Sequence, residues 1–335
     1  MQKNLLIALA IVGTLTAGFF LFRNKPTQTV DVNQTALKDI YNQWKVNYKI
    51  NVGASEDTYR FKVFTNTYQD ITRHNKLLGR GYNKGLNAFS HLTDEEFAAT
   101  HLGAYVRNTS VTNFANLTTD NLRTSVDWRA KMNPIKNQGQ CGSCWAFSAV
   151  GAIEGAHSVF KGQLFNLSEQ ELVDCSGGYG NMGCNGGNED QGIQYAVDNG
   201  GLATEADYPY TATDGTCQTR KKTFTKYGKV AKVNAVARNS PKALMAALDK
   251  QPTTVAVQAN AWKSYSSGIF SDASCGTSLN HAVIAVGYNT EGQTPYYIVR
   301  NSWGPNWGEA GHIKVAIQDG KGVCGINMEP FYPSL

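Results

Sequence analysis

The position of the cysteines is the feature that most constrains this 335-residue chain. All seven lie between Cys141 and Cys324, and the first 140 residues contain none. In an oxidising compartment most of them should pair, because disulfides form and persist there. An odd number leaves at least one thiol over, and such a thiol can be reactive. We therefore expect a cysteine-free N-terminal part and a C-terminal part that is held by disulfides.

The first 25 residues do not suit a globular fold. Lys3 precedes an uncharged, largely apolar run of 18 residues, from Leu5 to Phe22, and basic residues follow it. A basic start before an apolar stretch is typical of a secretory signal peptide, which we place at residues 1–18. The run to residue 22 also borders on the length of a retained membrane anchor. Either interpretation directs the chain into the secretory pathway.

Residues 34–78 carry the spacing of amphipathic helices. Apolar residues recur every three or four positions, at Leu37, Ile40, Tyr41 and Trp44 and again at Phe61, Phe64, Tyr68, Ile71 and Leu78. A polar stretch rich in Thr and Asn follows at 108–120. Its composition is typical of a linker that proteases can cut. The pattern predicts a helical domain over 34–96 and a linker over 97–121.

The charge is divided unevenly between the two parts. The net charge of +5 comes from 13 Lys/Arg and 9 Asp/Glu in residues 1–121, and from 18 and 17 in residues 122–335. A nucleic-acid binder should concentrate basic charge in its folded part. The larger part is nearly neutral, so we expect no nucleic-acid partner.

From about Leu122 onward, predicted helices precede predicted strands. One helix should run from near Ser143 toward Phe160, and another should begin at Ser168, whose side chain can form a capping box with Glu171. A short helix is predicted over 241–249, and apolar runs predict strands over 253–258, 282–288, 296–301 and 312–316. This order is typical of the α+β class, here with two subdomains and a cleft between them.

The densest motif is Gln138-Gly139-Gln140-Cys141-Gly142-Ser143-Cys144-Trp145-Ala146-Phe147. Cys144 stands where a helix should begin, and a helix N-terminus lowers the pKa of a thiol toward the nucleophilic thiolate. The C-x-x-C spacing of Cys141 and Cys144 alone would also suit zinc or a redox pair. Zinc would need a second such pair or paired histidines, which the sequence lacks, and a thioredoxin-type site would occupy a much smaller unit.

Two further motifs lie downstream. Asn280-His281-Ala282-Val283 places a histidine 137 residues after Cys144, and Asn301-Ser302-Trp303-Gly304 places an asparagine 157 residues after it. A single histidine is more often structural, but these residues in this order fit the papain and cathepsin pattern. With Cys184-Asn185-Gly186-Gly187 as another landmark, residues 122–335 resemble the mature domain of papain-like cysteine proteases.

The resemblance implies a fold and a set of roles. The fold has a helical left domain, a β-barrel-like right domain and a cleft between them, preceded by an α-helical propeptide domain. Cys144 would attack the scissile carbonyl, while His281 would hold the thiolate as an ion pair and protonate the leaving amine. Asn301 would orient the imidazole, and Trp303 would shield that hydrogen bond. Gln138 and the backbone N–H of Cys144 would form the oxyanion hole.

The same resemblance implies disulfides and substrate contacts. The pairs would be Cys141–Cys184, Cys175–Cys217 and Cys275–Cys324, which leaves Cys144 as the free thiol; the sequence alone does not fix this connectivity. Gly186 and Gly187 would present bare backbone to an extended substrate, because close approach requires glycine. The backbone of Asn280 and the ring of Trp303 would face the substrate as well.

Two features concern the pocket for the second residue before the cut. Asn188-Glu189-Asp190 stands where the family commonly has an aromatic or apolar pair, and Glu329 matches the floor of that pocket. Acids there resemble relatives that accept Arg as well as apolar residues, so we expect some preference for Arg or Lys. The alternative is that Glu189 and Asp190 face solvent, which we expect of Asp190.

The helical N-terminal domain resembles the inhibitory propeptide of these enzymes. One motif is Glu56, Arg60, Phe64, Thr67, Ile71 and Asn75, with Thr67 in place of the family's Asn; the other is Gly85, Asn87, Phe89 and His91, with His91 in place of Asp. The resemblance implies that this segment crosses the cleft in reverse and is removed near Leu122. His91 is either a trigger for acid activation, since histidine titrates nearest that range, or a neutral change.

We therefore predict a cysteine endopeptidase made as a zymogen, with its own propeptide as inhibitor and proteins or peptides as substrates. We expect a monomer without cofactor or metal, free of the membrane after maturation, in a lysosome, a vacuole or the extracellular space. Asn33, Asn108, Asn116 and Asn166 begin tripeptides that fit the N-glycosylation pattern.

Three alternatives stay open. An exopeptidase of the same fold would narrow its cleft with an insertion, and no His-rich insertion follows Cys184. A dead inhibitor-binding or storage protein would have lost Cys144, His281 or Asn301, and all three are present. A zinc-binding module would be detected by metal analysis of the folded protein.

Overall fold

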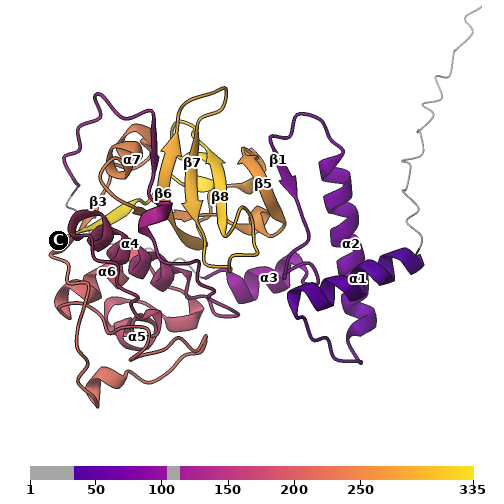
Figure 1. Ribbon diagram of the computed structural model, residues 1–335, viewed down its shortest axis with the longest axis horizontal. Helices are drawn as coiled ribbons and strands as arrows, with labels where there is room; N and C mark the ends of the chain where they lie inside the picture. The colour runs from indigo at the N-terminus through magenta and orange to yellow at the C-terminus, as the bar shows by residue number, and fades with distance from the viewer. Residues whose placement is uncertain (1–33, 104–113) are drawn as a thin grey trace, which may run out of the picture.

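A computed structural model of the chain describes residues 34–103 and 114–335 (Figure 1). The proposed signal peptide, the possible membrane anchor and the basic residues on either side of it therefore lie outside the described residues. In Figure 1 the N-terminal helices stand on the right and the sheet lies in the middle. The helical half of residues 122–335, the predicted peptidase part, lies to the lower left. None of the described helices is long and apolar enough to cross a membrane.

The N-terminal helical prediction is confirmed, but as two helices. Helix α1 spans Gln34–Tyr48 and α2 spans Asp57–Asn75. Their buried aromatic residues, Tyr41, Trp44 and Phe64, pack together into a small core. Leu78 lies beyond the end of α2 and is fully exposed, so its placement on the apolar face is wrong. A three- or four-residue spacing does not show where a helix stops.

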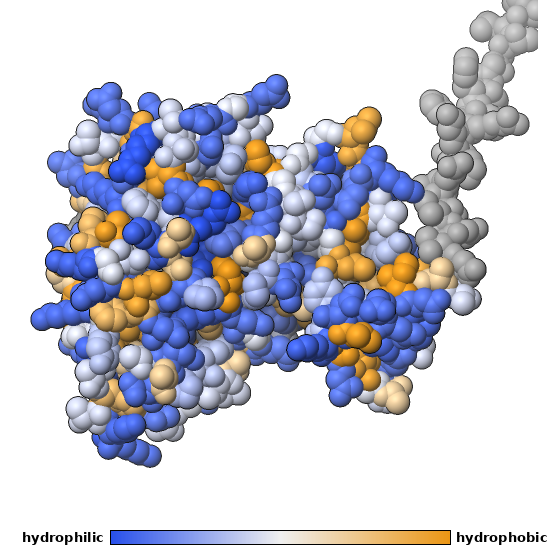
Figure 2. Space-filling model, viewed as in Figure 1, coloured by the Kyte–Doolittle hydropathy of each residue, from blue (hydrophilic) through white to orange (hydrophobic). Residues whose placement is uncertain are grey.

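The N-terminal part then joins the sheet of the peptidase part. Strand β1, Tyr82–Lys84, pairs antiparallel with β5, Tyr265–Phe270. Helix α3, Asp94–His101, follows and begins with a complete capping box between Thr93 and Glu96. In Figure 2 this part stands out as a separate lobe on the right. A short strand and one short helix thus attach the lobe to the remainder of the molecule.

The sheet is open. Its strands follow the order β1-β5-β8-β7-β6-β4-β9-β3, and β2 pairs with β6 outside that path. The four predicted strands are confirmed as β4 (Thr253–Val257), β6 (His281–Asn289), β7 (Tyr296–Arg300) and β8 (His312–Ala316). The sequence interpretation missed β2 (Ser125–Asp127), β3 (Lys232–Ala235), β5 and β9 (Phe331–Ser334). The end strands β1 and β3 do not pair with each other, so the barrel-like region is not a closed barrel.

The helical half is built around α4, Cys144–Lys161, which is buried along nearly all of its length. It ends at Gly162, whose left-handed conformation suits glycine. Helix α5 spans Glu169–Cys175, α6 spans Glu189–Asp198, and the predicted short helix is α7, Pro241–Leu248. The expected mixture of helices and strands in two halves is confirmed.

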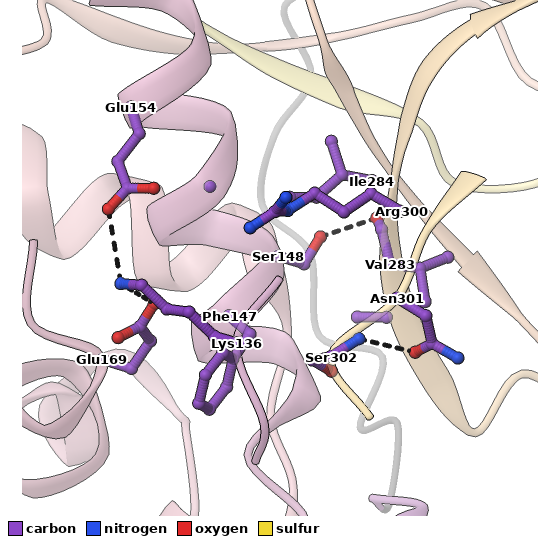
Figure 3. A pocket seen from close by; sticks show the side chains of 12 residues that line it. Lys136, Phe147, Ser148, Glu154, Glu169, Val283, Ile284, Arg300, Asn301 and Ser302 are labelled. Carbon is purple, nitrogen blue, oxygen red and sulfur yellow. Dashed lines mark hydrogen bonds and ion pairs between the residues drawn. The ribbon is translucent and has the colours of Figure 1, made fainter. Parts of the chain in front are cut away.

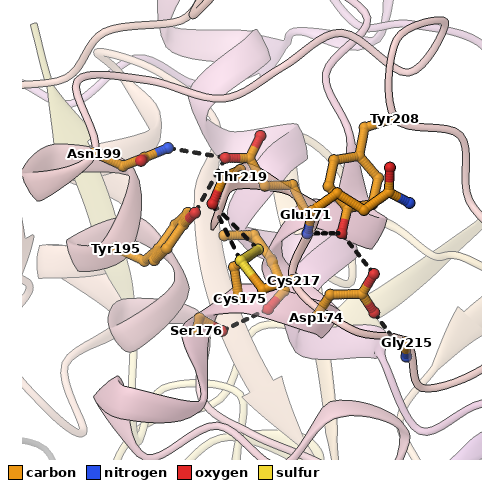
Figure 4. Close-up of a disulfide and its surroundings, with 12 residues drawn as sticks. Glu171, Asp174, Cys175, Ser176, Tyr195, Asn199, Tyr208, Gly215, Cys217 and Thr219 are labelled. Carbon is orange, nitrogen blue, oxygen red and sulfur yellow. Dashed lines mark hydrogen bonds between the residues drawn. A yellow bond between two sulfur atoms is a disulfide. The ribbon is translucent and has the colours of Figure 1, made fainter. Parts of the chain in front are cut away.

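The capping box predicted at Ser168 forms only in part. The Ser168 hydroxyl accepts a hydrogen bond from the backbone N–H of Glu171, as expected. The Glu171 carboxylate instead turns into the helical half, where it contacts Lys226 and accepts hydrogen bonds from Tyr195 and Asn199. This group lies beside the Cys175–Cys217 disulfide (Figure 4). A buried carboxylate takes the partners that neutralise it, in preference to a backbone N–H at the helix start.

Three disulfides join the pairs Cys141–Cys184, Cys175–Cys217 and Cys275–Cys324, and Cys144 is the free cysteine. These are the pairs that the family resemblance implies. All six bonded cysteines lie in the peptidase part, so the N-terminal lobe depends on its own aromatic core, on polar contacts and on apolar residues such as Phe89 and Phe97 that pack into the main core.

Candidate active site

The candidate nucleophile and base meet where the helical half contacts the sheet. Cys144 is the first residue of α4, and His281 is the first residue of β6. The two elements are held in register by the Ser148 hydroxyl, which donates to the carbonyl oxygen of Val283 at 2.8 Å. Both side chains are buried, with 3% of Cys144 and 1% of His281 exposed. The arrangement suits a thiol and an imidazole that act together.

His281 is held by two residues of the downstream motif. Its Nε2 lies 2.8 Å from the Oδ1 of Asn301, and the Trp303 ring stacks on the imidazole at 4.7 Å between centroids. The Nδ1 is buried and has no hydrogen-bond partner within residues 34–103 and 114–335. One nitrogen is therefore fixed, and the other is left for a proton from a nearby group.

Gln138 is fully buried and its amide is oriented from both ends. Its Nε2 donates to the carbonyl oxygens of Cys141 and His101, at 2.9 and 3.1 Å. Its Oε1 accepts a 2.6 Å hydrogen bond from the Ser302 hydroxyl. The backbone oxygen of Gln138 accepts from the Tyr210 hydroxyl at 2.7 Å. An amide N–H held in this way can stabilise a developing oxyanion without reorganisation.

Ser302 and Tyr210 were missed by the sequence interpretation. Ser302 lies inside the quoted Asn301-Ser302-Trp303-Gly304 motif, which could have indicated it. Tyr210 has no such signal, because it is brought to the site from 66 residues beyond Cys144 by the fold. Its hydroxyl also lies 2.6 Å from the Ser143 hydroxyl, so it links Gln138 to the residue before the nucleophile.

The N-terminal lobe continues directly over Cys144. The backbone N–H of Gly103 donates to the carbonyl oxygen of Asn280 at 3.0 Å. A Cβ on Gly103 would lie 2.7 Å from the Gly142 oxygen, 3.2 Å from the Cα of Gly186 and 3.5 Å from the Sγ of Cys144. Only a bare backbone fits at such distances. Gly186 and Asn280 therefore face an extended chain here, and that chain belongs to the protein itself.

Two hydrogen bonds give the direction of this covering segment. His101 offers its carbonyl oxygen to Gln138, and two residues later Gly103 offers its N–H to Asn280. Within one residue the N–H precedes the C=O along the chain. A substrate residue that donated its N–H to Asn280 and placed its C=O at Gln138 would therefore run from Asn280 toward Gln138. The covering segment runs the opposite way, so it fills the site without presenting a peptide bond in the orientation of a substrate.

Burial disfavours the charged forms of both reacting groups. It raises the pKa of the Cys144 thiol to about 11, although hydrogen bonds from the backbone N–H groups of Ala282 and Gly103 act to lower that pKa. It lowers the pKa of His281 to about 4, although the bond to Asn301 favours the charged ring. The thiolate–imidazolium pair expected of a mature enzyme is therefore disfavoured while the segment covers the site.

Three acids are buried near Gly186 and Gly187, the glycines predicted to face a substrate. Glu189 at the start of α6, its neighbour Asp190, and Glu329 are each at most 2% exposed. The expectation that Asp190 faces solvent is therefore wrong, because α6 packs its first turn against the body. Burial, then Asp190 and Glu329, raise the pKa of Glu189 well above its usual range. Arg238 lies near the cluster, with its Nη2 3.8 Å from the Oε2 of Glu329.

Gly187 has a structural role that the sequence did not indicate. A Cβ there would lie 2.5 Å from the Oδ1 of Asn181 and 2.9 Å from the Trp145 ring. Trp303 likewise does more than face the cleft, since Phe89 and Phe97 of the N-terminal lobe contact its ring edge to face. Both Gly187 and Trp303 therefore have packing roles in the precursor, in addition to the substrate contacts predicted for them.

Two histidines of the N-terminal lobe lie near the site. His101 packs between Phe89 and Phe97, and burial lowers its pKa to about 4. His91 packs on Trp44, and burial and then the Arg60 guanidinium lower its pKa. Arg60 donates to the carbonyl oxygen of His91 and pairs with Glu96 at 2.7 Å. Both histidines are therefore held in the neutral form.

A small internal cavity of about 20 Å³ lies behind Asn301, between α4 and the sheet (Figure 3). At its edge the Lys136 ammonium reaches Glu169 at 2.7 Å and Glu154 at 3.4 Å. Both carboxylates are almost fully buried, and burial raises the pKa of Glu169 against the pull of Lys136. The group ties the segment just before Gln138 to α4 and α5.

Comparison with known proteins agrees with this geometry. Residues 122–334 match the model of the papain family cysteine protease, and residues 41–97 match that of the cathepsin propeptide inhibitor domain. A probable cysteine protease RD21C of Arabidopsis thaliana is 41% identical, over 99% of this chain and 75% of its own. A digestive cysteine proteinase 1 of Homarus americanus is 43% identical, over 85% and 90%.

Solved precursors have the same fold. A recombinant stem bromelain precursor matches with a TM-score of 0.82 at 37% identity, over 90% of this chain and 99% of its own. Digestive procathepsin L 3 from the larval midgut of Tenebrio molitor matches with a TM-score of 0.78 at 34% identity, over 89% and 99%. The chain belongs to the papain family of cysteine proteases and carries the propeptide inhibitor domain of a zymogen.

Proposed function

We propose that the mature enzyme is an endopeptidase that cleaves peptide bonds through a thioester on Cys144, and that an acidic pocket accepts Arg as well as apolar side chains at the second residue before the cut. The observation that carries the reaction is the state of His281. Asn301 holds its Nε2, and its buried Nδ1 has no partner among the described residues, at the site of the free thiol.

In the first half of the reaction Cys144 gives its proton to the Nδ1 of His281, and the thiolate adds to the scissile carbonyl carbon. The carbonyl oxygen becomes an oxyanion, which the Nε2–H of Gln138 and the backbone N–H of Cys144 stabilise. The C–N bond then breaks, and His281 returns its proton to the departing amine. The acyl group is left as a thioester on Cys144.

In the second half a water molecule takes the place of the amine. His281 accepts a proton from the water, and the hydroxide adds to the thioester carbon with the same oxyanion donors. The C–S bond breaks, the acid product leaves and Cys144 recovers its proton from His281. The fixed partners of Gln138 and His281 support this cycle, since neither donor must reorganise during it.

The precursor form follows from the covering segment. We propose that residues 34–96 are the inhibitory domain, that 97–121 link it to residues 122–335, and that removal near Leu122 uncovers Cys144. Residues 1–18 would direct a monomeric precursor into the secretory pathway, toward a vacuole, a lysosome or the extracellular space. Proteins and peptides would be the substrates.

The specificity proposal rests on the acidic cluster. Glu189 is fully buried and neither of its carboxylate oxygens has a hydrogen-bond partner within the described residues. A buried carboxyl without a partner is costly, and a cationic side chain from outside would supply one. A neutral Glu189 would equally tolerate an apolar side chain, which agrees with a mixed preference.

Paired peptide substrates with Arg or Leu at the second position before the cut test this proposal on the matured enzyme. We expect Glu329→Ala and Glu189→Gln each to lower kcat/KM for the Arg substrate about tenfold, and to leave the Leu substrate within about twofold. Arg238→Gln is the matched control, because it removes a competing cation and should favour the Arg substrate. Equal changes for both substrates would refute the acidic pocket and leave the peptidase assignment intact.

A further inference from the structure

The tripeptide Asn166-Leu167-Ser168 connects α4 to α5 and is firmly held. Leu167 is buried, its N–H donates to Glu154 and its carbonyl oxygen accepts from Lys136. The carbonyl oxygen of Asn166 accepts from the N–H of Glu205 at 2.8 Å. The Asn166 side chain, in contrast, is exposed and makes none of the hydrogen bonds found among the described residues.

The surface around Asn166 is unusually apolar. Phe160 is 53% exposed, Leu164 is 46% exposed and Tyr227 is 38% exposed. The ring of Phe165, which directly precedes Asn166, lies 5.6 Å from the ring of Tyr227. Single exposed apolar residues are ordinary, but three of them, together with the half-buried Phe165 that directly precedes the acceptor tripeptide, suggest a surface that is covered in the native protein.

We propose that Asn166 carries an N-linked oligosaccharide whose first sugars cover the apolar surface formed by Phe160, Leu164, Phe165 and Tyr227. The Nδ2 of Asn166 forms a bond to the anomeric carbon of an oligosaccharide carried on a lipid pyrophosphate. The bond from that carbon to the pyrophosphate oxygen breaks, the amide loses one proton and the lipid pyrophosphate leaves. The inference rests on the proposed passage through the secretory pathway, where this donor is found.

The fold determines when this transfer takes place. Ser168 supplies the hydroxyl of the acceptor pattern, but in the folded chain that hydroxyl is fully buried and donates to the Tyr208 carbonyl oxygen at 2.5 Å. It also caps α5 by accepting from the N–H of Glu171. The pattern is therefore accessible only before residues 204–208 dock, and before the Cys175–Cys217 disulfide closes that region. Transfer to Asn166 competes with folding.

A structural interpretation of Ser168 alone makes a different prediction. Serine is a favoured helix cap, so the tripeptide can arise without any modification. Cap formation does not account for an exposed Asn166 inside an apolar surface. The position is also compatible with activity, because the tripeptide lies beside Glu154, which is separated from Cys144 by about 15 Å of helix.

Asn116 provides a matched comparison within the same chain. Asn116 and Thr118 are both exposed, and they lie in the linker that we expect maturation to remove. A glycan there would not compete with folding and would be lost from the mature enzyme. A glycan on Asn166 would persist.

The experiment expresses the full chain in eukaryotic cells and maps both sites by peptide mass spectrometry after treatment with peptide N-glycosidase. We expect the mature enzyme to lose one oligosaccharide mass, with the converted asparagine at position 166. Asn166→Gln should abolish that shift, Ser168→Thr should keep it, and Asn116→Gln should leave it unchanged. A mild reductant in the medium should raise the modified fraction at Asn166 and not at Asn116.

The outcomes separate this inference from the secretory proposal. A glycan on Asn116 of the precursor with an unmodified Asn166 would overturn the inference and support passage through the secretory pathway. A precursor retained in the cytosol without glycans would overturn both. Matured Asn166→Gln enzyme should bind more of a hydrophobic dye than the native enzyme, at an activity within about twofold, and equal dye binding would refute the covering of the apolar surface.

Discussion

Buried carboxyls occur in the peptidase part, whereas the described residues of the N-terminal lobe bury histidines and no carboxyl. In the peptidase part the carboxyls of Glu169 and Glu189 have raised pKa values because they are buried. In the lobe the imidazoles of His91 and His101 have lowered pKa values for the same reason. Burial favours the neutral form in every case, and the neutral form of an acid carries a proton whereas that of a histidine does not.

These two sets of buried groups therefore respond to acid with opposite signs. A carboxyl with a raised pKa binds more protons in the folded state, so it adds stability as the pH falls toward the ordinary value of about 4.5. A histidine with a lowered pKa binds more protons once released, so docking of the lobe weakens as the pH falls from about 6.5 toward 4. His281 and His312 of the peptidase part, whose pKa values are both lowered to about 4 by burial, act against this trend.

This difference shows how the peptidase part can be stable while the N-terminal lobe can still be released from it. The peptidase part has three disulfides and buried ion pairs, while the lobe is attached through β1, the covering segment and polar contacts such as Lys263 to Asp94 at 2.5 Å. Acidification should loosen the inhibitor under conditions in which the buried carboxyls of Glu169 and Glu189 add stability to the peptidase part.

The largest expected effect comes from the same change made in each region. Lys136→Met leaves Glu154 and Glu169 buried without their cation, which should cost about 3–5 kcal/mol at pH 7. Lys38→Met removes an exposed partner of Asp57, which keeps Lys45, and should cost less than about 1 kcal/mol. Urea unfolding of both variants in a Cys144→Ser background measures the difference.

The cost of Lys136→Met should fall as the pH falls, because the freed Glu169 carboxylate, whose pKa burial already raises, can then take up a proton. Equal losses of unfolding free energy in the Lys136→Met and Lys38→Met variants, or a loss for Lys136→Met that grows in acid, would contradict the proposed difference between the two regions.

A smaller effect is expected from His101→Phe. Phenylalanine keeps the packing against Phe89 and Phe97 and removes the group that takes up a proton on release. The polar groups that face the His101 ring are the Thr100 hydroxyl at 2.7 Å from its Nδ1, His91, and His281 from β6, while the Gln138 amide donates to the backbone oxygen of His101. We expect acid activation of the full chain at about pH 4.5 to slow by about tenfold to a hundredfold, with little change at pH 7.

The rate of activation is measured as the growth of peptidase activity after a jump in pH. A control, His74→Phe, changes another buried histidine of the lobe that lies away from the cleft, beside Tyr82. If both variants activate like the native chain, the histidine account of release is incorrect.

The smallest effect is expected from His91→Asp. An aspartate beside Arg60 would be stabilised as a carboxylate, so on release it would take up a proton near pH 4, whereas a released histidine takes one up near 6.5. The variant should require a more acidic medium to mature, with less than about a tenfold change in rate at any one pH. A pH profile of maturation that matches the native chain would indicate a neutral substitution.

Much of the fold was predictable where a single local signal sufficed. The start of α4 at Cys144, the strand at His281 and the helix at Pro241 follow from motif, apolar run and cap. The end of α2 before Leu78 was not predictable from spacing, and β9 was missed because Pro333 interrupts a short run. Strand β1 has three residues and exists because β5 pairs with it, which no local pattern indicates.

The candidate site shows the same division. Cys144, His281 and Asn301 were identified from motif and order, because each stands in a distinctive context. Tyr210 and Ser302 support Gln138 through contacts that only the fold creates. The burial of Asp190 was mispredicted, because a charged residue is expected to be exposed when its neighbours in the fold are not known.

The most direct test of the account is the reaction of Cys144 with an epoxide-type thiol inhibitor. The intact chain is labelled at pH 7, and again after brief exposure to about pH 4.5, with Cys144→Ser as the control. We predict little labelling before acid, stoichiometric labelling of Cys144 after it, and none in the control. Full labelling of the intact chain at pH 7 would contradict the covered site, and no labelling under either condition would contradict the nucleophile itself.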